Sequence, residues 1–246
     1  RVSVLKEQSV TWCGLCPRGD VALYLLNKQL GDKVVTLAGH YANGESQVDP
    51  MNILGDNITS QAERFADYGL VAMTLSSLLG GGGLPGAMFD RVVAADPYVG
   101  ANTTKGKNGT YEYGATDLVN LLKEENPSEA DFSMTASWAD DKNTDIKVDL
   151  TTTFNYNRFG SFPYGVAFVL SENGMTGQGA TWKQINHYSK LAGVNGASDI
   201  NNPDMAAWFK AGSYVSTTYD NVVVQDWNPL GAAAIVDKSK TDIDKG

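Results

Sequence analysis

The sequence predicts an α/β domain in residues 1–129 followed by a mostly β domain in residues 130–246. In the first part, short apolar runs typical of buried strands alternate with segments whose apolar residues recur at helical spacing. From about residue 128 onwards, apolar and polar residues alternate with a period of two, which is typical of antiparallel strands with one face in solvent. A chain of 246 residues has room for two such domains.

A strand–helix–strand unit is predicted at the start of the first domain. Residues 2–5 are expected to form a strand, and residues 20–30 a helix, because apolar side chains recur there at positions i, i+3 and i+4. Residues 34–38 are a continuous apolar run, typical of a strand in a parallel sheet covered on both faces. Further elements of this domain are expected as helices over residues 60–69 and 116–125 and a strand over residues 87–93.

The second domain is predicted from its alternating side chains. Such strands are expected over residues 132–138 and 146–154, and a more apolar strand over residues 164–170. Short helical segments are expected over residues 181–191 and 203–210. The sequence therefore predicts a sheet with helical insertions.

The composition excludes some classes of partner. The formal net charge is −9, whereas a nucleic-acid-binding domain normally has a basic face. No apolar run approaches the roughly 20 residues that cross a bilayer as a helix. We therefore expect no nucleic-acid partner and no transmembrane segment in this chain, and no sequence pattern calls for a cofactor.

The two cysteines of the chain, Cys13 and Cys16, lie between the first predicted strand and the first predicted helix. A thiol at a helix N-terminus meets unpaired backbone N–H groups and the positive end of the helix dipole, which favour the thiolate. Such a thiolate attacks disulfides, and a second cysteine one turn later resolves the mixed disulfide. This C-x-x-C placement is typical of thioredoxin-like redox proteins. We expect Cys13 to cap the helix with its sulfur partly exposed.

Two other interpretations of the cysteine pair stay open. A structural zinc ion usually takes four Cys or His ligands, and the sequence offers only Cys13, Cys16, His40 and His187, of which the histidines lie far apart along the chain. The pair can also form a disulfide without catalytic function. No metal site is expected.

His40 follows the second predicted strand directly. The carboxyl ends of parallel strands share one edge of a sheet, so His40 is expected on the same edge as Cys13. Protonated His40 there would lower the pKa of the Cys13 thiol. The alternative is a loop histidine held by a hydrogen bond.

Several motifs occur in the order found in a known family. They are residues 7–19 (E-Q-S-V-T-W-C-G-L-C-P-R-G), His40 with Asp49-Pro50, Gly83-Leu84-Pro85 leading to Asp90-Arg91, and Ser171-Glu172-Asn173-Gly174 followed by Gln178. With these motifs the chain resembles the thioredoxin-like outer membrane proteins of Bacteroidetes, the "twenty-eight kilodalton type" family. The resemblance covers most of the chain and is most specific around the cysteines.

The resemblance implies a thioredoxin-like domain followed by a β-sandwich domain. It also implies an exported protein held at the outer membrane, on its periplasmic or cell-surface face, through a lipid anchor upstream of this chain. The partners it implies are protein thiols or disulfides and an outer-membrane protein. The activity implied is that of a thiol–disulfide oxidoreductase. The alternative is a surface lipoprotein that binds a protein or glycan and keeps the thioredoxin fold only as a scaffold.

The same resemblance assigns roles to single residues. Cys13 is implied to be the attacking thiol and Cys16 the resolving one. Pro85 matches the cis-proline that faces the dithiol, and Glu7 matches a buried acid that relays a proton for the resolving cysteine. Glu7 on the solvent face of its strand is the alternative. The residues implied in binding are Trp12, His40 and Leu84. Of these, Leu84 would pair with an extended peptide through its backbone groups.

Some positions depart from the family pattern. Leu15 stands where a proline is usual, and Pro17 removes an N–H that would close the first helical turn.

Similar proteins continue into further strands beyond the equivalent of residue 246. We therefore expect the second domain to be incomplete at its C-terminal end, with an open sheet edge, unless residues 222–224 and 232–236 close the sheet.

Overall fold

A computed structural model describes the following parts of the chain: residues 2–53, 55, 84–90, 93–95, 128–156, 165–166, 168–191, 205–227 and 233–234. Contacts divide the chain into two compact units. The larger unit comprises Val2–Glu124 and Phe168–Leu230, and the smaller one Glu125–Ala167 and Gly231–Gly246 with Arg1. This grouping differs from the predicted division at residue 130. The helices expected over 60–69 and 116–125 lie outside the described residues.

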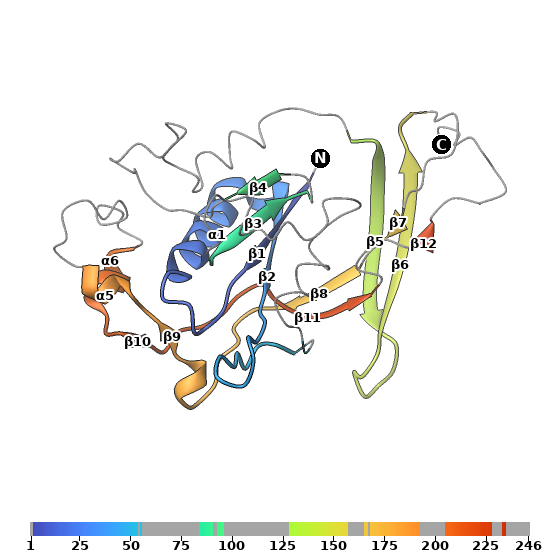
Figure 1. The fold of residues 1–246 in the computed structure, drawn as a ribbon. Coiled ribbons are helices and arrows are strands. Elements are labelled where there is room, and N and C mark those ends of the chain that lie inside the picture. Colours follow the sequence, from blue (N-terminus) through green and yellow to red (C-terminus); the bar gives the residue numbers. More distant parts are fainter. Residues whose placement is uncertain are drawn as a thin grey trace. The chain divides into compact units, whose positions relative to one another are not determined.

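A six-stranded sheet organises the larger unit. Its strand order is β4-β3-β1-β2-β11-β8 (Figure 1), with β1 parallel to β2 and antiparallel to β3. The strands span Ser3–Gln8 (β1), Val34–Gly39 (β2), Gly86–Phe89 (β3), Val93–Ala95 (β4), Phe168–Glu172 (β8) and Val222–Trp227 (β11). The predicted parallel pairing of the first two strands is therefore confirmed. The strand expected over 87–93 is replaced by β3 and β4, which pair antiparallel on either side of a turn at Asp90.

Helix α1 (Pro17–Leu30) packs on the sheet. Its buried Leu23 and Leu26 contact Leu5 of β1 and Val34 of β2. Successive side chains of a strand point to opposite faces, so Glu7 shares the face of Leu5 and lies beneath α1. The start of α1 is therefore held directly over β1.

Two short helices, α5 (Tyr188–Leu191) and α6 (Ala206–Lys210), pack on another side of α1 (Figure 1). The rings of Tyr188 and Phe209 meet edge to face at 5.4 Å, and both side chains join a buried cluster with Val21 of α1. Among the described residues of this unit, the remaining short elements are the 3-10 helices Gly31–Lys33 and Ala180–Trp182 and the strands β9 (Gln184–Ile185) and β10 (Tyr214–Val215). A chain segment far from the cysteines in sequence thus packs against the helix that follows them.

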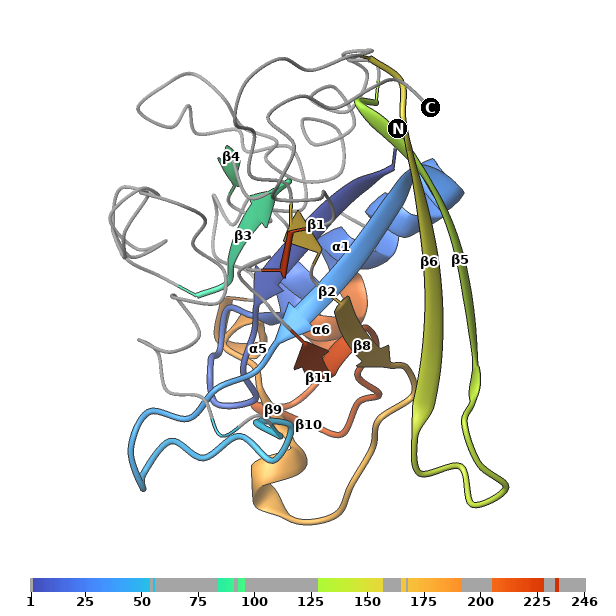
Figure 2. The ribbon, with the colours of Figure 1, turned by 90° about the vertical axis from the view of Figure 1, so that its right-hand side faces the viewer.

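The smaller unit contains a long hairpin of β5 (Ala130–Trp138) and β6 (Ile146–Phe154), which run side by side in Figure 2. A second pair is formed by β7 (Gly165–Val166) and β12 (Ala233–Ala234). The hairpin register sets Met134 opposite Leu150 and Trp138 opposite Ile146, so apolar side chains share one face as the alternation predicts. Met134 and Trp138 are nevertheless exposed. The β-sandwich and its open edge stay predictions.

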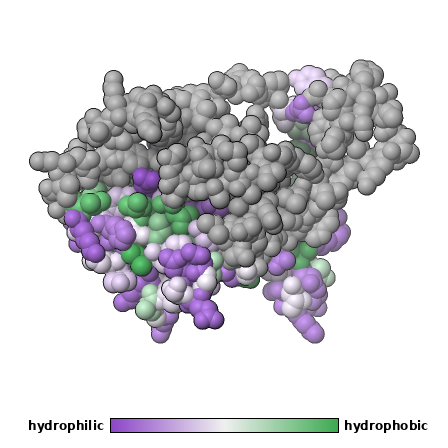
Figure 3. Space-filling view, viewed as in Figure 1, coloured by the Kyte–Doolittle hydropathy of each residue, from purple (hydrophilic) through white to green (hydrophobic). Residues whose placement is uncertain are grey.

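Polar residues dominate the described surface in the lower half of Figure 3. Within the described part of the chain, the helices are all too short or too polar to cross a bilayer.

Candidate functional site

The cysteines lie in a turn between β1 and α1, and Cys16 occupies the N-cap position of the helix. The expectation that Cys13 caps the helix is therefore wrong. Pro17 is the physical reason. In an α-helix the residue four positions after Cys13 would donate its N–H to the Cys13 carbonyl, and a proline has no N–H to donate. The Cys16 N–H donates to that carbonyl instead, at 3.3 Å, which makes a tighter turn. Pro17 is well tolerated at the first helical position.

The two thiols have different environments. Cys13 is half-buried, whereas Cys16 is fully buried, and both are free thiols. A hydrogen bond from the Cys16 thiol lowers the pKa of Cys13, and backbone N–H groups of Leu15 and Cys16 act in the same direction, against the opposing effect of burial. Burial raises the pKa of Cys16 well above its usual value. Cys13 is thus the accessible and more acidic thiol.

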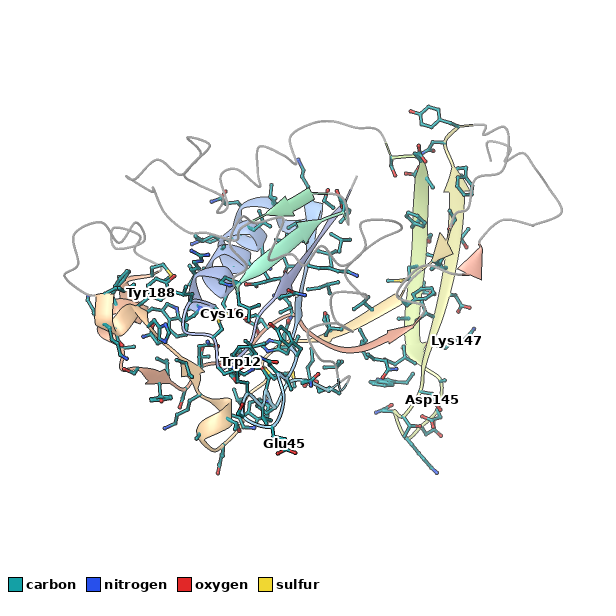
Figure 4. The ribbon with its side chains drawn as sticks, viewed as in Figure 1. Trp12, Cys16, Glu45, Asp145, Lys147 and Tyr188 are labelled. Carbon is teal, nitrogen blue, oxygen red and sulfur yellow. The ribbon has the colours of Figure 1, made fainter. Side chains whose placement is uncertain are left out.

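The Leu84–Pro85 segment lies next to Cys13, and its peptide bond is cis. The Cys13 thiol donates to the Leu84 carbonyl at 3.5 Å. Trp12 is half-buried in the same apolar cluster, and its ring meets that of Tyr41 edge to face at 5.7 Å. Figure 4 shows Trp12 close to Cys16. The structure therefore brings together Trp12, the cysteines and Leu84.

Glu7 lies on the buried face of β1 and is completely inaccessible to solvent, so the alternative of a solvent-facing Glu7 is wrong. Its carboxyl group lies against Gly19 of α1, where a Cβ atom would collide with Glu7 Oε1 and approach Pro85 Cβ within 2.8 Å. Burial raises the pKa of Glu7 well above its usual value, and the charges of Asp20 and Cys13 raise it further, whereas Arg18 lowers it. A protonated carboxyl group is therefore favoured here.

Gly19→Ala is expected to lower the free energy of unfolding by about 1–3 kcal/mol, because the added methyl group overpacks the space shared with Glu7 and Pro85. The gain in helix propensity, about 1 kcal/mol, offsets only part of this. Urea unfolding followed by tryptophan fluorescence measures the change. Gly212→Ala is the control, since its Cβ would meet nothing within 4 Å. Equal stability of the two variants would contradict the close contact.

Asp20, in the first turn of α1, is a second acidic group at the site. Its Oδ1 atom accepts a hydrogen bond from the Ser9 hydroxyl at 3.2 Å. Burial raises the pKa of Asp20 to about 6, whereas the charge of His40 and the Ser9 hydrogen bond hold it down. The sequence alone did not identify Asp20, because its environment comes from β1, α1 and the loop after β2.

His40 is buried and its Nδ1 lies 2.9 Å from Asp49 Oδ2. Asp49 also accepts hydrogen bonds from the Thr11 N–H at 2.8 Å and from the Met51 N–H at 2.9 Å. The loop after β2 is thereby tied to the turn that carries the cysteines. His40 is thus a hydrogen-bonded loop histidine, and an electrostatic effect on Cys13 stays a prediction.

Two residues distant in sequence also contact the cysteine turn. The amide of the buried Gln184 donates to the Cys13 carbonyl at 2.7 Å, and the His187 N–H donates to the Gly14 carbonyl at 3.0 Å. The His187 ring lies directly over Gly14, so a side chain at position 14 would collide with it. No sequence signal identified Gln184, and His187 stood out only as a potential zinc ligand.

A cavity of about 270 Å³ lies beside this site. Its polar wall contains Glu7, Asp20, Asn27, His40, Thr218 and Asn221. Among the described residues, no group of three or more His, Cys, Asp or Glu side chains is arranged to hold a metal ion. The site thus combines a half-buried thiol, a buried thiol, the buried carboxyl group of Glu7 and the partly buried carboxyl group of Asp20.

Comparison with models of protein families, with curated proteins and with solved structures finds no match to this chain.

Proposed function

We propose that this protein is a thiol–disulfide oxidoreductase with a thioredoxin-like domain, in which Cys13 is the attacking thiol and Cys16 the resolving thiol. The observation that carries the proposal is the asymmetry of the pair. The half-buried Cys13 has a lowered pKa because the buried Cys16 donates a hydrogen bond to it. A partly exposed thiol with a lowered pKa is the one that reacts with disulfides.

The reaction has two steps. The Cys13 thiolate attacks one sulfur of a substrate disulfide, forms a mixed disulfide and releases the other substrate sulfur as a thiolate. Cys16 then loses its proton and attacks the Cys13 sulfur, which forms the Cys13–Cys16 disulfide and releases the second substrate thiolate. The substrate gains two electrons and the protein dithiol loses them.

The strand order and the residues around the dithiol support this proposal. Strands β4-β3-β1-β2 form a mixed sheet whose central strand leads into the cysteine turn, and α1 follows that turn. The Leu84 carbonyl, at 3.5 Å from the Cys13 sulfur, marks where an extended peptide would run past the thiol. The outer-membrane location and the protein disulfide substrates implied by the family resemblance belong to the same proposal.

Single cysteine variants test it. Cys16→Ser, treated with oxidised glutathione, is expected to accumulate a stable glutathione adduct on Cys13, whereas Cys13→Ser is expected to form none because Cys16 is buried. Intact mass spectrometry detects the adduct. At pH 7, iodoacetamide should modify Cys13 about tenfold faster than free cysteine, because a lowered pKa increases the thiolate fraction. If Cys13 does not react in the folded protein, the alternative is favoured, namely a surface lipoprotein that keeps the thioredoxin fold only as a scaffold.

A further inference from the structure

A segment from the second half of the chain lies along one side of the cysteine turn. The Ile185 N–H donates to the Thr11 carbonyl at 2.7 Å. The amide of the buried Gln184 donates to the Cys13 carbonyl at 2.7 Å and to the Val10 carbonyl at 3.3 Å. Because these hydrogen bonds hold the segment against the turn, it forms part of the surface that a substrate meets beside Cys13.

The same segment covers Gly14, the residue that follows Cys13. The His187 N–H donates to the Gly14 carbonyl at 3.0 Å, and the His187 ring lies directly over Gly14. Gly14 is buried there, whereas His187 is exposed. A substrate that reaches the Cys13 sulfur therefore borders the His187 side chain.

This side of the cysteine turn is basic, although the chain as a whole has a formal net charge of −9. It is built from residues 173–191 and 205–219, which the structure describes throughout. These two segments contain no aspartate or glutamate, and their charged residues are Lys183, Lys190 and Lys210. All three lysine side chains are exposed, so their charges face solvent and approaching molecules.

Two of these lysines are close to the contacts with the cysteine turn. Lys183 directly precedes Gln184, whose amide contacts the Cys13 carbonyl. The Lys190 N–H donates to the His187 carbonyl at 3.0 Å, so Lys190 lies one turn after the residue that covers Gly14. At an ionic strength of 0.1 M a charge acts over about 10 Å. An anionic group beside His187 would therefore be attracted by both lysines.

The acidic residues near the turn do not cancel this charge. Asp20 and Asp49 have hydrogen-bond partners within the protein. Glu45 is exposed, but it belongs to the loop after β2, and Figure 4 shows it on the other side of Cys16 from Tyr188. Among the described residues, the exposed charge on α5 and on the segment before it is therefore positive.

We propose that this protein reacts preferentially with polypeptide disulfides that have acidic residues next to the cysteine, and that Lys183 and Lys190 select them. The carboxylates of such a substrate lie beside His187 while Cys13 attacks the sulfur. This inference rests on the proposed function of Cys13. It is the opposite of the preference that net charge alone would give, because a protein with a formal net charge of −9 repels acidic peptides.

Three blocked peptides test this preference. They have aspartate, serine or lysine on both sides of a single cysteine, whose thiol is joined to 2-thiopyridine in a mixed disulfide. The full chain is used as the Cys16→Ser variant, so that only attack by Cys13 is measured. The Cys13 thiolate attacks the peptide sulfur, forms a Cys13–peptide disulfide and releases pyridine-2-thione, whose absorbance gives the rate. Each rate is divided by that of the same peptide with N-acetylcysteine amide, a neutral thiol, which corrects for the reactivity of the peptide itself.

At pH 7 and an ionic strength of 0.1 M, the aspartate peptide should react about fivefold faster than the serine peptide, and the lysine peptide more slowly than either. At 1 M salt the three rates should become equal, because charges then act over only about 3 Å. Lys183→Gln and Lys190→Gln should each lower the ratio of the aspartate rate to the serine rate about twofold. Lys33→Gln is the control, since Lys33 is exposed and lies just before β2, at the end of the sheet opposite to the cysteine turn. It should leave the ratio unchanged.

Equal rates for the three peptides at 0.1 M, or a lysine peptide that reacts fastest, would overturn the inference. A preference for the aspartate peptide that survives in the double variant of Lys183→Gln and Lys190→Gln would also overturn it, because other groups would then select the substrate. Failure of the proposed function looks different, because none of the three peptides would then form an adduct with Cys13.

Discussion

Asp49→Ala is expected to lower the free energy of unfolding by about 3–5 kcal/mol, the usual cost of removing one partner from a buried charged network. The Asp49 carboxylate is buried and accepts hydrogen bonds from Thr11 and Met51 backbone N–H groups, and it pairs with His40. Alanine would leave these groups buried without an acceptor. Urea unfolding followed by tryptophan fluorescence measures the loss.

Asp220→Ala is the matched control for this prediction. Asp220 also accepts a backbone hydrogen bond, from the Gly174 N–H at 2.8 Å, but it is exposed, so water replaces the lost acceptor. A much smaller change is therefore expected. If Asp49→Ala and Asp220→Ala unfold at the same urea concentration, the buried network does not stabilise the cysteine turn.

The contribution of Asp20 to the stability of the protein is expected to fall as pH rises from 4 to 7. The pKa of Asp20 rises from 3.8 to about 6 on folding, so the folded protein holds this proton more tightly than the unfolded chain does. Its stabilising contribution is complete below about pH 4 and is lost as pH rises through about 6. The difference in pKa corresponds to about 3 kcal/mol.

Asp20→Asn cannot titrate, so its free energy of unfolding should gain about 2.5 kcal/mol relative to wild type between pH 4 and pH 7.5. Urea unfolding of both proteins at the two pH values measures this difference. Glu7→Gln should gain in the same direction, because burial also raises the pKa of Glu7. Asp32→Asn, at an exposed position, should show no such change. If the free energies of unfolding of the wild-type protein and Asp20→Asn differ by the same amount at both pH values, the pKa of Asp20 is not raised by folding.

The order of strand, cysteine pair and helix was predictable because it depends on neighbours in sequence. Residues 34–38 are apolar throughout, and β2 is indeed an interior strand between β1 and β11. The alternation at residues 132–138 likewise gave β5 and its apolar face. The start of the helix was missed by a few residues, because Pro17 changes the hydrogen bonding of the turn before it.

The partners of later strands were not predictable in the same way. The apolar run at residues 222–224 predicts a strand but not its neighbours. In the structure β11 pairs with β2 and β8, so it belongs to the sheet that carries the cysteines. Strand pairing depends on backbone hydrogen bonds, which every residue except proline can make, and a single sequence leaves the choice of partner open.

By itself, the sequence determined which atoms can do redox chemistry, since Cys13 and Cys16 are its two thiols and lie one turn apart at the start of a helix. Only the tertiary structure decided which thiol is accessible and which acid is charged. Glu7 and Asp20 are both carboxylic acids. Glu7 is buried and no described residue donates a hydrogen bond to it, whereas Asp20 accepts one from Ser9 and lies near His40. The protonation state of a carboxyl group depends on burial and on neighbours in space, and folding brings those neighbours from β1, α1 and the loop after β2.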